Sequence, residues 1–377
     1  MKAVLSILLI STGLLLSCSN ETSNEPTSPE STQVQHTETS IAVSDSVSKE
    51  AAKRQYNVLG WHRYERGENY KTYQYDILNM LAYFAYKVNP STGENENDIK
   101  WETARIIDSA QSHDCKVYLT LENFGYGKNR TFLENEAAQK KLIQNVVGML
   151  KQRKATGACI DFEEVPQLHK EQFNDFLLDL SKELKMEELE LLVVLQLYEP
   201  ENAADPNTLK DAVDQYVMMG YACYHKGSTH AGPISPLRSG DTWEPYSLEP
   251  NIEAYLNHGF PANQFMVALP LYGGIWETET DHVNSKSIEG ISTPTVNQAL
   301  RDFANQALMI DSISQSSYYI YTKDGAIQQC WFEGPQSMSV KMHFIKDKGL
   351  SGIGLWALGY AHGNEKIWGG IRAVFVD

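Results

Sequence analysis

Eight short runs of apolar and β-branched residues recur between residues 56 and 357, and helical patterns separate most of them. Residues 101–113, 135–151, 170–184, 250–257 and 336–348 carry apolar residues at three- and four-residue spacing, which predicts helices. Strands that alternate with helices are typical of a parallel sheet, and eight of them predict a (β/α)8 TIM barrel in the α/β class. A doubly wound open sheet is the alternative, but no glycine-rich phosphate turn follows the first run. The predicted strands are Tyr56–Trp61, Met80–Tyr86, Lys116–Leu121, Gly157–Phe162, Leu191–Gln196, Tyr216–Tyr221, Phe265–Leu271 and Ser351–Ala357.

One connection interrupts this rhythm, at about residues 277–332, after the seventh strand. It contains a helical pattern at Val296–Gln306 and two strand-like runs, Tyr318–Thr322 and Ile327–Phe332. The Asp324-Gly325 pair between the two runs is a hairpin signal. We therefore predict a small α+β insertion packed over the mouth of the barrel.

The N-terminus predicts export and a lipid anchor. A charged start is followed by an apolar block, 3–16, which is too short to span a bilayer, and Leu15-Leu16-Ser17-Cys18 resembles a bacterial lipobox. An ordinary signal peptide with an incidental cysteine is the alternative, but nothing A-x-A-like follows. We expect a signal peptide at 1–18 that ends at a lipidated Cys18, a disordered tether at 19–54, and a folded domain at 55–377. The protein would then lie in the bacterial cell envelope, on the periplasmic or cell-surface side, and contact the membrane through its lipid only.

Charge and cysteine content restrict the partners. The chain has 48 Asp and Glu against 32 Lys and Arg, which argues against nucleic acid and suits an uncharged ligand. Cys115, Cys159, Cys223 and Cys330 form no C-x-x-C pair and no zinc-type cluster. We expect the first three to be buried free thiols. We also expect no disulfide framework, no metal and no cofactor. The protein is expected to be a monomer.

The fourth predicted strand carries carboxylates. Because side chains alternate along a strand, Gly157, Cys159, Asp161 and Glu163 share one face. In a barrel this face points toward the axis and rises to the C-terminal rim, where barrel enzymes hold their active sites. Carboxylates two residues apart lie about 6 to 7 Å from each other at Cβ, so one can stay protonated near neutral pH. The alternative is a helix cap or an ion pair, but no basic residue lies nearby on this face; Glu164, at a turn, points away from it.

The segment Thr156–Glu163 resembles the D-G-x-D-x-D-x-E signature of glycoside hydrolase family 18, the chitinases and their relatives. The match is at Gly157, Asp161 and Glu163. Other segments resemble the family in the right order along the whole folded region. Four of them are 213–221, 232–237, 268–273 with Trp276, and 352–360. A fifth, Gln329-Cys330-Trp331-Phe332, is similar to the chitobiase and spore-cortex-lytic branch.

The resemblance implies a glycosidase of the chitinase or β-N-acetylglucosaminidase type, with a retaining mechanism in which the acetamido oxygen of the substrate attacks the anomeric carbon. It implies that Glu163 is the general acid/base and that Asp161 binds the acetamido N–H. Tyr221 would steady the acetamido group, and Trp356 would form the apolar floor under the −1 sugar. Alternatively, Tyr221 is an ordinary tyrosine at the end of a strand, and Trp356 is a tryptophan of the apolar core.

Three further aromatic residues are candidates for substrate binding. Tyr272 and Trp276 lie at the start of the loop after the seventh strand, and Trp61 ends the first strand. Each of them could stack on a sugar face, and each could equally be packing.

The chain departs from the family at three acidic positions: Thr156, Cys159, and Ala222 or, with one residue of slip, Cys223. Cys159 is a further candidate for the substrate-binding site. It would lie beneath Asp161, where a thiol is neutral and a weak hydrogen-bond partner. Asp161 should therefore ionise more readily than with an aspartate at 159. The departures keep open a second reading, a glycan-binding surface lipoprotein with weak or no catalysis. The glycan itself, whether chitin oligomer, peptidoglycan fragment or N-glycan core, and exo or endo cleavage stay open.

Overall fold

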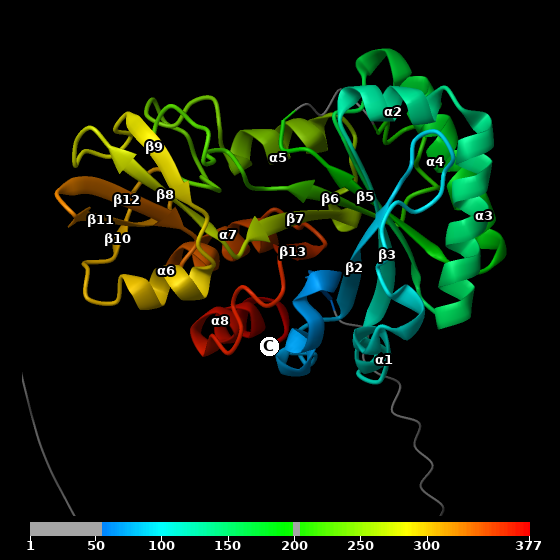
Figure 1. Ribbon diagram of the computed structural model, residues 1–377, viewed down its shortest axis with the longest axis horizontal. Helices are drawn as coiled ribbons and strands as arrows, with labels where there is room; N and C mark the ends of the chain where they lie inside the picture. The colour runs from blue at the N-terminus through cyan, green and yellow to red at the C-terminus, as the bar shows by residue number, and fades with distance from the viewer. Residues whose placement is uncertain (1–54, 199–203) are drawn as a thin grey trace, which may run out of the picture. The chain divides into compact units, whose positions relative to one another are not determined.

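A computed structural model describes residues 55–198 and 204–377. The predicted signal peptide, the tether and Cys18 lie outside the described residues. The predicted barrel is confirmed: eight parallel strands close in the order β1-β13-β7-β6-β5-β4-β3-β2. Figure 1 shows the helices outside the strands. The barrel strands are β1 (Asn57–Arg63), β2 (Met80–Lys87), β3 (Lys116–Phe124), β4 (Gly157–Glu163), β5 (Glu190–Leu195), β6 (Gln215–Met219), β7 (Phe265–Pro270) and β13 (Gly352–Trp356).

All five predicted helices are present, with shifted bounds. The largest shift is at 101–113, where Trp101–Thr103 forms a 3-10 turn and the α-helix begins only after the extended residue Ala104. Two helices, α2 and α8, were not predicted. The helices are α1 (Arg105–Gln111), α2 (Tyr126–Leu133), α3 (Glu136–Arg153), α4 (Lys170–Met186), α5 (Leu248–Asn257), α6 (Val296–Asp302), α7 (Pro335–Asp347) and α8 (Glu365–Phe375), with 3-10 segments η1 (Tyr64–Thr72), η2 (Trp101–Thr103), η3 (Gln167–His169) and η4 (Ala262–Gln264).

The predicted insertion is a five-stranded sheet with α6, and it follows β7 directly. Its order is β10-β11-β12-β8-β9. Asp324 and Gly325, both with positive φ, form the predicted hairpin turn between β11 and β12. β8, β9 and β10 were not predicted, and α6 ends at Asp302 rather than Gln306. The strands are β8 (Gly273–Thr278), β9 (Ser287–Ser292), β10 (Met309–Ile310), β11 (Ser317–Lys323) and β12 (Ala326–Phe332).

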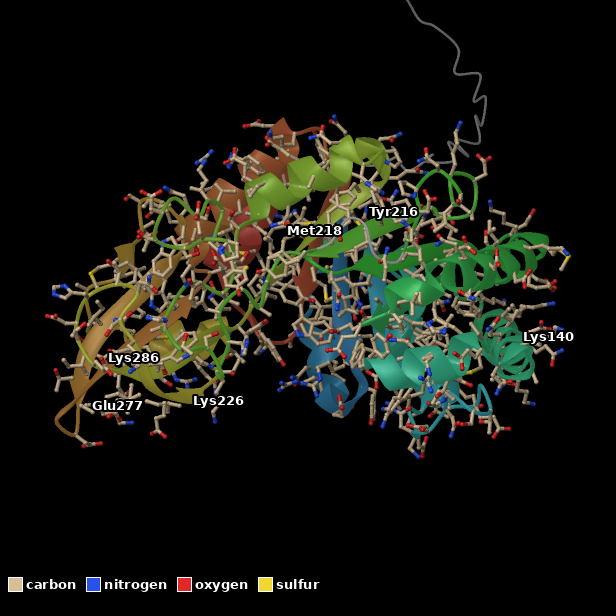
Figure 2. The ribbon with its side chains drawn as sticks, turned by 90° about the horizontal axis from the view of Figure 1, so that it is seen from above. Lys140, Tyr216, Met218, Lys226, Glu277 and Lys286 are labelled. Atoms are coloured by element: carbon tan, nitrogen blue, oxygen red, sulfur yellow. The ribbon has the colours of Figure 1, made fainter. Side chains whose placement is uncertain are left out.

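A buried ion pair ties the insertion to the barrel. Lys341 of α7 contacts Glu333, which directly follows β12, and both side chains are 0 % exposed. Ser316 donates a hydrogen bond of 2.8 Å to the second oxygen of Glu333. In Figure 2, Tyr216 and Met218 of β6 lie in the barrel, while Lys226, Glu277 and Lys286 gather around the insertion. The ion pair therefore holds the insertion against the barrel, near the C-terminal ends of β6 and β7.

Two apolar cores hold the barrel. The larger core lies between the strands and the helices, and the smaller core fills the barrel interior. Along each strand, side chains of the smaller core alternate with side chains of the larger core. Within the described ranges, no helix has the length and apolar character needed to cross a bilayer. The buried members of the interior core are Leu59, Trp61, Met80, Ala82, Tyr118, Cys159, Leu192, Val194, Val217, Met266 and Ala268.

Candidate active site

β4 places its side chains as the sequence pattern predicts. Its even-numbered residues from 158 to 162 pack in the core under the helices, and Phe162 stacks on Phe176 of α4 with ring centroids 5.8 Å apart. Cys159 belongs to the interior core. The first residue of the strand, Gly157, must be a glycine, because a Cβ there would lie 2.0 Å from the carbonyl oxygen of Glu190. The inward face therefore rises from this glycine to the carboxylates of the rim.

A pocket of about 530 Å³ opens at the C-terminal ends of the strands. It brings together five residues that the sequence singled out: Asp161, Glu163, Tyr221, Trp356 and, as a departure from the family, Ala222. The other lining residues lie at or just beyond the ends of barrel strands, and that position is the signal by which the sequence could have found them. They are Arg63, Phe84, Phe124, Gln196, Leu197, Tyr198 and Met219.

Asp161 is a buried carboxylate that lines this pocket. It is 6 % exposed, and its Oδ1 has no hydrogen-bond partner among the described residues. Burial, and then the charges of Glu163 and Glu122, raise the pKa of Asp161 well above its usual range. A buried acceptor without a donor is unfavourable, so a ligand N–H placed against Oδ1 would gain a hydrogen bond and relieve this cost.

Glu163 stands at the end of β4, half-buried in the same pocket. Burial raises its pKa, and the nearby carboxylates of Glu164 and Glu122 raise it further. Glu164 itself is exposed, with positive φ, and does not line the pocket. A carboxyl group whose pKa is raised in this way holds its proton closer to neutral pH, as a general acid must.

Two asparagines, which the sequence did not single out, hold the backbone at Glu163. Asn129 of α2 donates through Nδ2 to the carbonyl oxygen of Glu163. Asn123 donates in turn to Oδ1 of Asn129 at 2.9 Å. Both side chains are buried, and the N–H of Gly125 reaches the same Glu163 carbonyl at 3.2 Å. The β3–α2 connection therefore fixes the position from which the Glu163 side chain projects.

A third carboxylate, Glu122, was also missed. It lies opposite Asp161 in the register of β3 and β4, and opposite Lys87 in the register of β2 and β3. Burial raises the pKa of Glu122, whereas the charge of Lys87 opposes this effect. Glu122 therefore adds negative charge on the side of Asp161 away from β5, and this charge contributes to the raised pKa of both predicted acids.

Aromatic residues form the floor and the far wall. Trp356, the last residue of β13, is partly exposed and meets Phe84 edge to face at 4.8 Å. Trp61 packs against Trp356 at 6.1 Å but is only 2 % exposed, so it supports Trp356 from within the barrel. Tyr221 follows β6 and meets Tyr272 edge to face at 6.1 Å. The proposed floor and the proposed acetamido clamp therefore face one pocket.

Three of the predicted substrate contacts are buried: Trp61, which supports Trp356 and does not line the pocket, and Trp276 and Cys159. Trp276 is 0 % exposed, packs on Gly274 and donates through Nε1 to the carbonyl of His225 at 3.3 Å. It is a core residue of the insertion, so the expectation of a sugar contact is not met in this structure. Cys159 is likewise 0 % exposed and lies beneath the pocket. Its position limits it to an indirect effect through Asp161.

Known proteins resemble this chain in both sequence and fold. The model of glycosyl hydrolases family 18 matches residues 56–361. The chain belongs to glycosyl hydrolase family 18. A cortical fragment-lytic enzyme of Bacillus subtilis is 25 % identical over 271 residues, which cover 68 % of this chain and 59 % of that protein. This chain therefore spans less than two thirds of the length of that family 18 relative.

Solved family 18 structures share the fold. A chitinase from Cycas revoluta, solved with (GlcNAc)3, superposes with a TM-score of 0.75 at 14 % identity, covering 84 % of this chain and 99 % of that one. A chitinase-like agglutinin from Robinia pseudoacacia gives a TM-score of 0.75 at 15 % identity over the same shares. One fold thus serves a chitinase and an agglutinin, so the individual residues of the site must decide between the two functions.

The three departures from the family 18 acids differ in consequence. Thr156 lies at the base of β4, where its N–H donates to the carbonyl of Val117 and its Oγ1 accepts from the N–H of Val117 at 3.0 Å. At the sixth strand, Ala222 lines the pocket, and Cys223 is buried with its N–H bonded to Ile234. The pocket therefore carries a methyl group after Tyr221.

The four cysteines of the described residues all lie at buried positions. Cys115, Cys159 and Cys223 are buried free thiols, as predicted, and so is Cys330. Burial, and then the charge of Asp161, raise the pKa of Cys159 well above its usual range. Across 55–198 and 204–377, no three His, Cys, Asp or Glu side chains gather as metal ligands would.

Proposed function

We propose that this chain hydrolyses glycans that contain β-linked N-acetylglucosamine, by a retaining and substrate-assisted mechanism. The observation that carries the proposal is the unpartnered Oδ1 of buried Asp161 beside half-buried Glu163, in a pocket that Trp356 also lines. An acetamido N–H matches the first group, a glycosidic oxygen the second, and a pyranose face the third. Family 18 membership and the likeness to a chitinase solved with (GlcNAc)3 support this choice of sugar.

In the first step, Glu163 gives its proton to the glycosidic oxygen as the bond to the anomeric carbon breaks. The acetamido oxygen of the same sugar attacks that carbon and closes a cyclic oxazolinium ion. The Glu163 carboxylate then removes a proton from water, which attacks the anomeric carbon and reopens the ring. Two inversions leave the product with the configuration of the substrate, and Glu163 has regained its proton.

Asp161 and the aromatic residues orient this chemistry. The carboxylate of Asp161 accepts the acetamido N–H, which aims the acetamido oxygen at the anomeric carbon and stabilises the positive charge of the oxazolinium ion. Tyr221 reaches the acetamido group from the β6 side, and the Trp356 ring packs under the apolar face of the sugar. We further propose that a lipid on Cys18 anchors the protein in the cell envelope.

The alternative function is a glycan-binding surface protein. The observations that favour it are the pocket methyl group of Ala222 and the neutral thiol of Cys159, both at positions where family 18 has an acid. Retention of Glu163 favours the enzyme, because protonation of the leaving group is a task that binding alone does not require.

Release of fluorophore from chitobiose and chitotriose conjugates tests the proposal. Wild type should release it, and Glu163→Gln should lose at least about 100-fold of the rate, the range that positioned acid–base groups supply. Glu164→Gln is the matched control, because Glu164 is exposed and outside the pocket, and it should keep most of the rate. Binding of both conjugates without turnover, in wild type and Glu163→Gln alike, would instead support the glycan-binding protein. Products from chitooligosaccharides, muropeptide glycans and a high-mannose glycopeptide would then identify the glycan and the exo or endo mode.

A further inference from the structure

A second hollow, of about 350 Å³, adjoins the active-site pocket, and Trp356 lines both. Its remaining walls come from η1, from the residues after β7 and β13, and from the start of α6 in the insertion. Unlike the first pocket, it has no acidic residue in its lining, and it has one cation, Arg66. The lining residues that matter below are Arg66, Tyr272, Thr295, Gln298, Trp356 and Tyr360.

Arg66 is held in place without a counter-charge. Its guanidinium carbon lies 4.7 Å from the centroid of the Tyr360 ring. In the described part of the chain, no carboxylate lies within 4 Å of Arg66, whereas its neighbours Arg63 and Lys71 each have one, at 3.5 and 2.8 Å. Stacking on a ring face occupies the flat side of a guanidinium and leaves its N–H edge for an acceptor.

Neutral donors and acceptors stand across the hollow. The Oε1 of Gln298 accepts the backbone N–H of Thr295, and the Oγ1 of Thr295 accepts the N–H of Gln298, in a capping box that starts α6. Gln298 therefore has its NH2 group left as a donor. A cation with neutral polar groups around it, and no acid among the lining residues, is a site for an anionic substituent rather than for a plain sugar hydroxyl.

The hollow lies on the glycone side of the reacting bond. The leaving group must stand next to Glu163, which protonates it. Trp356 underlies the −1 sugar and borders both hollows, but neither Glu163 nor Asp161 lines the second one. In the proposed binding mode, the second hollow is therefore the place for the unit attached to the non-reducing side of the −1 sugar.

We infer that the unit next to the −1 N-acetylglucosamine carries a carboxylate, as in a 3-O-lactyl ether, and that the Arg66 guanidinium binds it. This inference rests on the proposed function and names its substrate class, an acidic amino-sugar glycan of the peptidoglycan type rather than chitin. The net charge of −16 repels such a glycan at long range. A local unpaired cation is the feature that selects the acid in spite of this repulsion.

The test compares three oligosaccharides with N-acetylglucosamine at the reactive position. The preceding unit is N-acetylglucosamine, N-acetylmuramic acid or the methyl ester of that acid. Wild type should cleave the acid with a kcat/KM about 10-fold above that for the ester, and the difference should shrink in high salt, because half-exposed charges are screened. Arg66→Gln should abolish the preference, so that kcat/KM for the acid falls to that for the ester, a larger loss than on the all-N-acetylglucosamine substrate. Arg238→Gln, which removes the same charge from an exposed site paired with Glu249, should change nothing.

The outcomes separate this inference from the proposed function. Equal cleavage of acid and ester by wild type, or an equal loss on every substrate in Arg66→Gln, overturns the Arg66 site but leaves the hydrolase intact. If no substrate is cleaved, the proposed function fails. In that case, calorimetry measures binding of the oligosaccharides to Glu163→Gln. Tighter binding of the acid than of the ester supports the inference if the difference is lost when Arg66→Gln is added. Equal binding of the two refutes it.

Discussion

Replacing Cys159 by aspartate restores the middle acid of the family 18 signature, and it should move the acid limb of the pH profile upward. Cys159 is 0 % exposed and lies on the inward face of β4, two residues before Asp161. Thr120 lies opposite it in register, and Trp61 lies beside it. Neither Trp61 Nε1 nor Thr120 Oγ1 makes a hydrogen bond of good geometry, so both can donate to a new carboxylate.

The size of the effect follows from the spacing of the two acids. Side chains two residues apart on a strand lie about 6.5 Å from each other. Two unit charges at that distance repel by about 2.5 kcal/mol at an effective dielectric constant of 20, which corresponds to roughly two pH units. A buried aspartate at 159 would be ionised only in part, so we expect a shift of about one unit.

The sign follows from the role of Asp161. In the proposed mechanism, its charged form binds the acetamido N–H and stabilises the oxazolinium ion, so activity should fall as Asp161 takes up a proton. A second negative charge below it disfavours ionisation and raises the pKa of Asp161, on top of the effects of burial, Glu163 and Glu122. As the pH is lowered, Cys159→Asp should therefore lose activity earlier, at a higher pH, than wild type does.

The assay is kcat/KM against pH on a chitotriose conjugate. Cys159→Asn is the matched control, because it has nearly the same size as aspartate and no charge, and its acid limb should stay at the wild-type position. Melting temperatures of all three proteins show whether the folded population is comparable. An acid limb that coincides in Cys159→Asp and Cys159→Asn, with both proteins folded, would refute the coupling.

Three further predictions follow from other parts of the chain. Asn129→Leu should lower kcat about 10-fold with KM nearly unchanged, because the backbone at Glu163 loses a donor; a lower melting temperature with normal kcat would mean that Asn129 only stabilises the fold. Lys341→Met should lower the free energy of unfolding in urea by about 3 to 5 kcal/mol, because it leaves Glu333 buried without its partner, and adding Glu333→Gln should recover most of this loss; no recovery would contradict the ion-pair argument. Cys18→Ala should move the protein from the membrane fraction to the soluble fraction, and an unchanged distribution would exclude the lipid anchor.

Hydrophobic periodicity was sufficient for the barrel and for the face of β4. Eight short apolar runs separated by helices can bury both faces in a parallel sheet covered by helices, and the count of eight, without a glycine-rich turn after the first run, favours the closed barrel over an open sheet. The alternation of Ile160, Asp161, Phe162 and Glu163 then decides which side chains face the axis. Of the segments that the sequence missed, α8 carries its buried residues at helical spacing and could have been predicted. The others, α2, β8, β9 and β10, are short, and their conformation depends on the neighbours against which they pack.

The sequence alone determined the strand count, the inward column from Gly157 to Glu163, and the family signature, because each depends on residues that are near in the chain. Only the tertiary structure decided which aromatic residues reach the pocket. Trp276 and Trp356 both follow strand patterns, yet one is enclosed by the insertion and the other forms the floor. The structure likewise set Glu122 opposite Asp161 and Arg66 over Tyr360. Such pairings join residues far apart in sequence, so no local pattern can encode them.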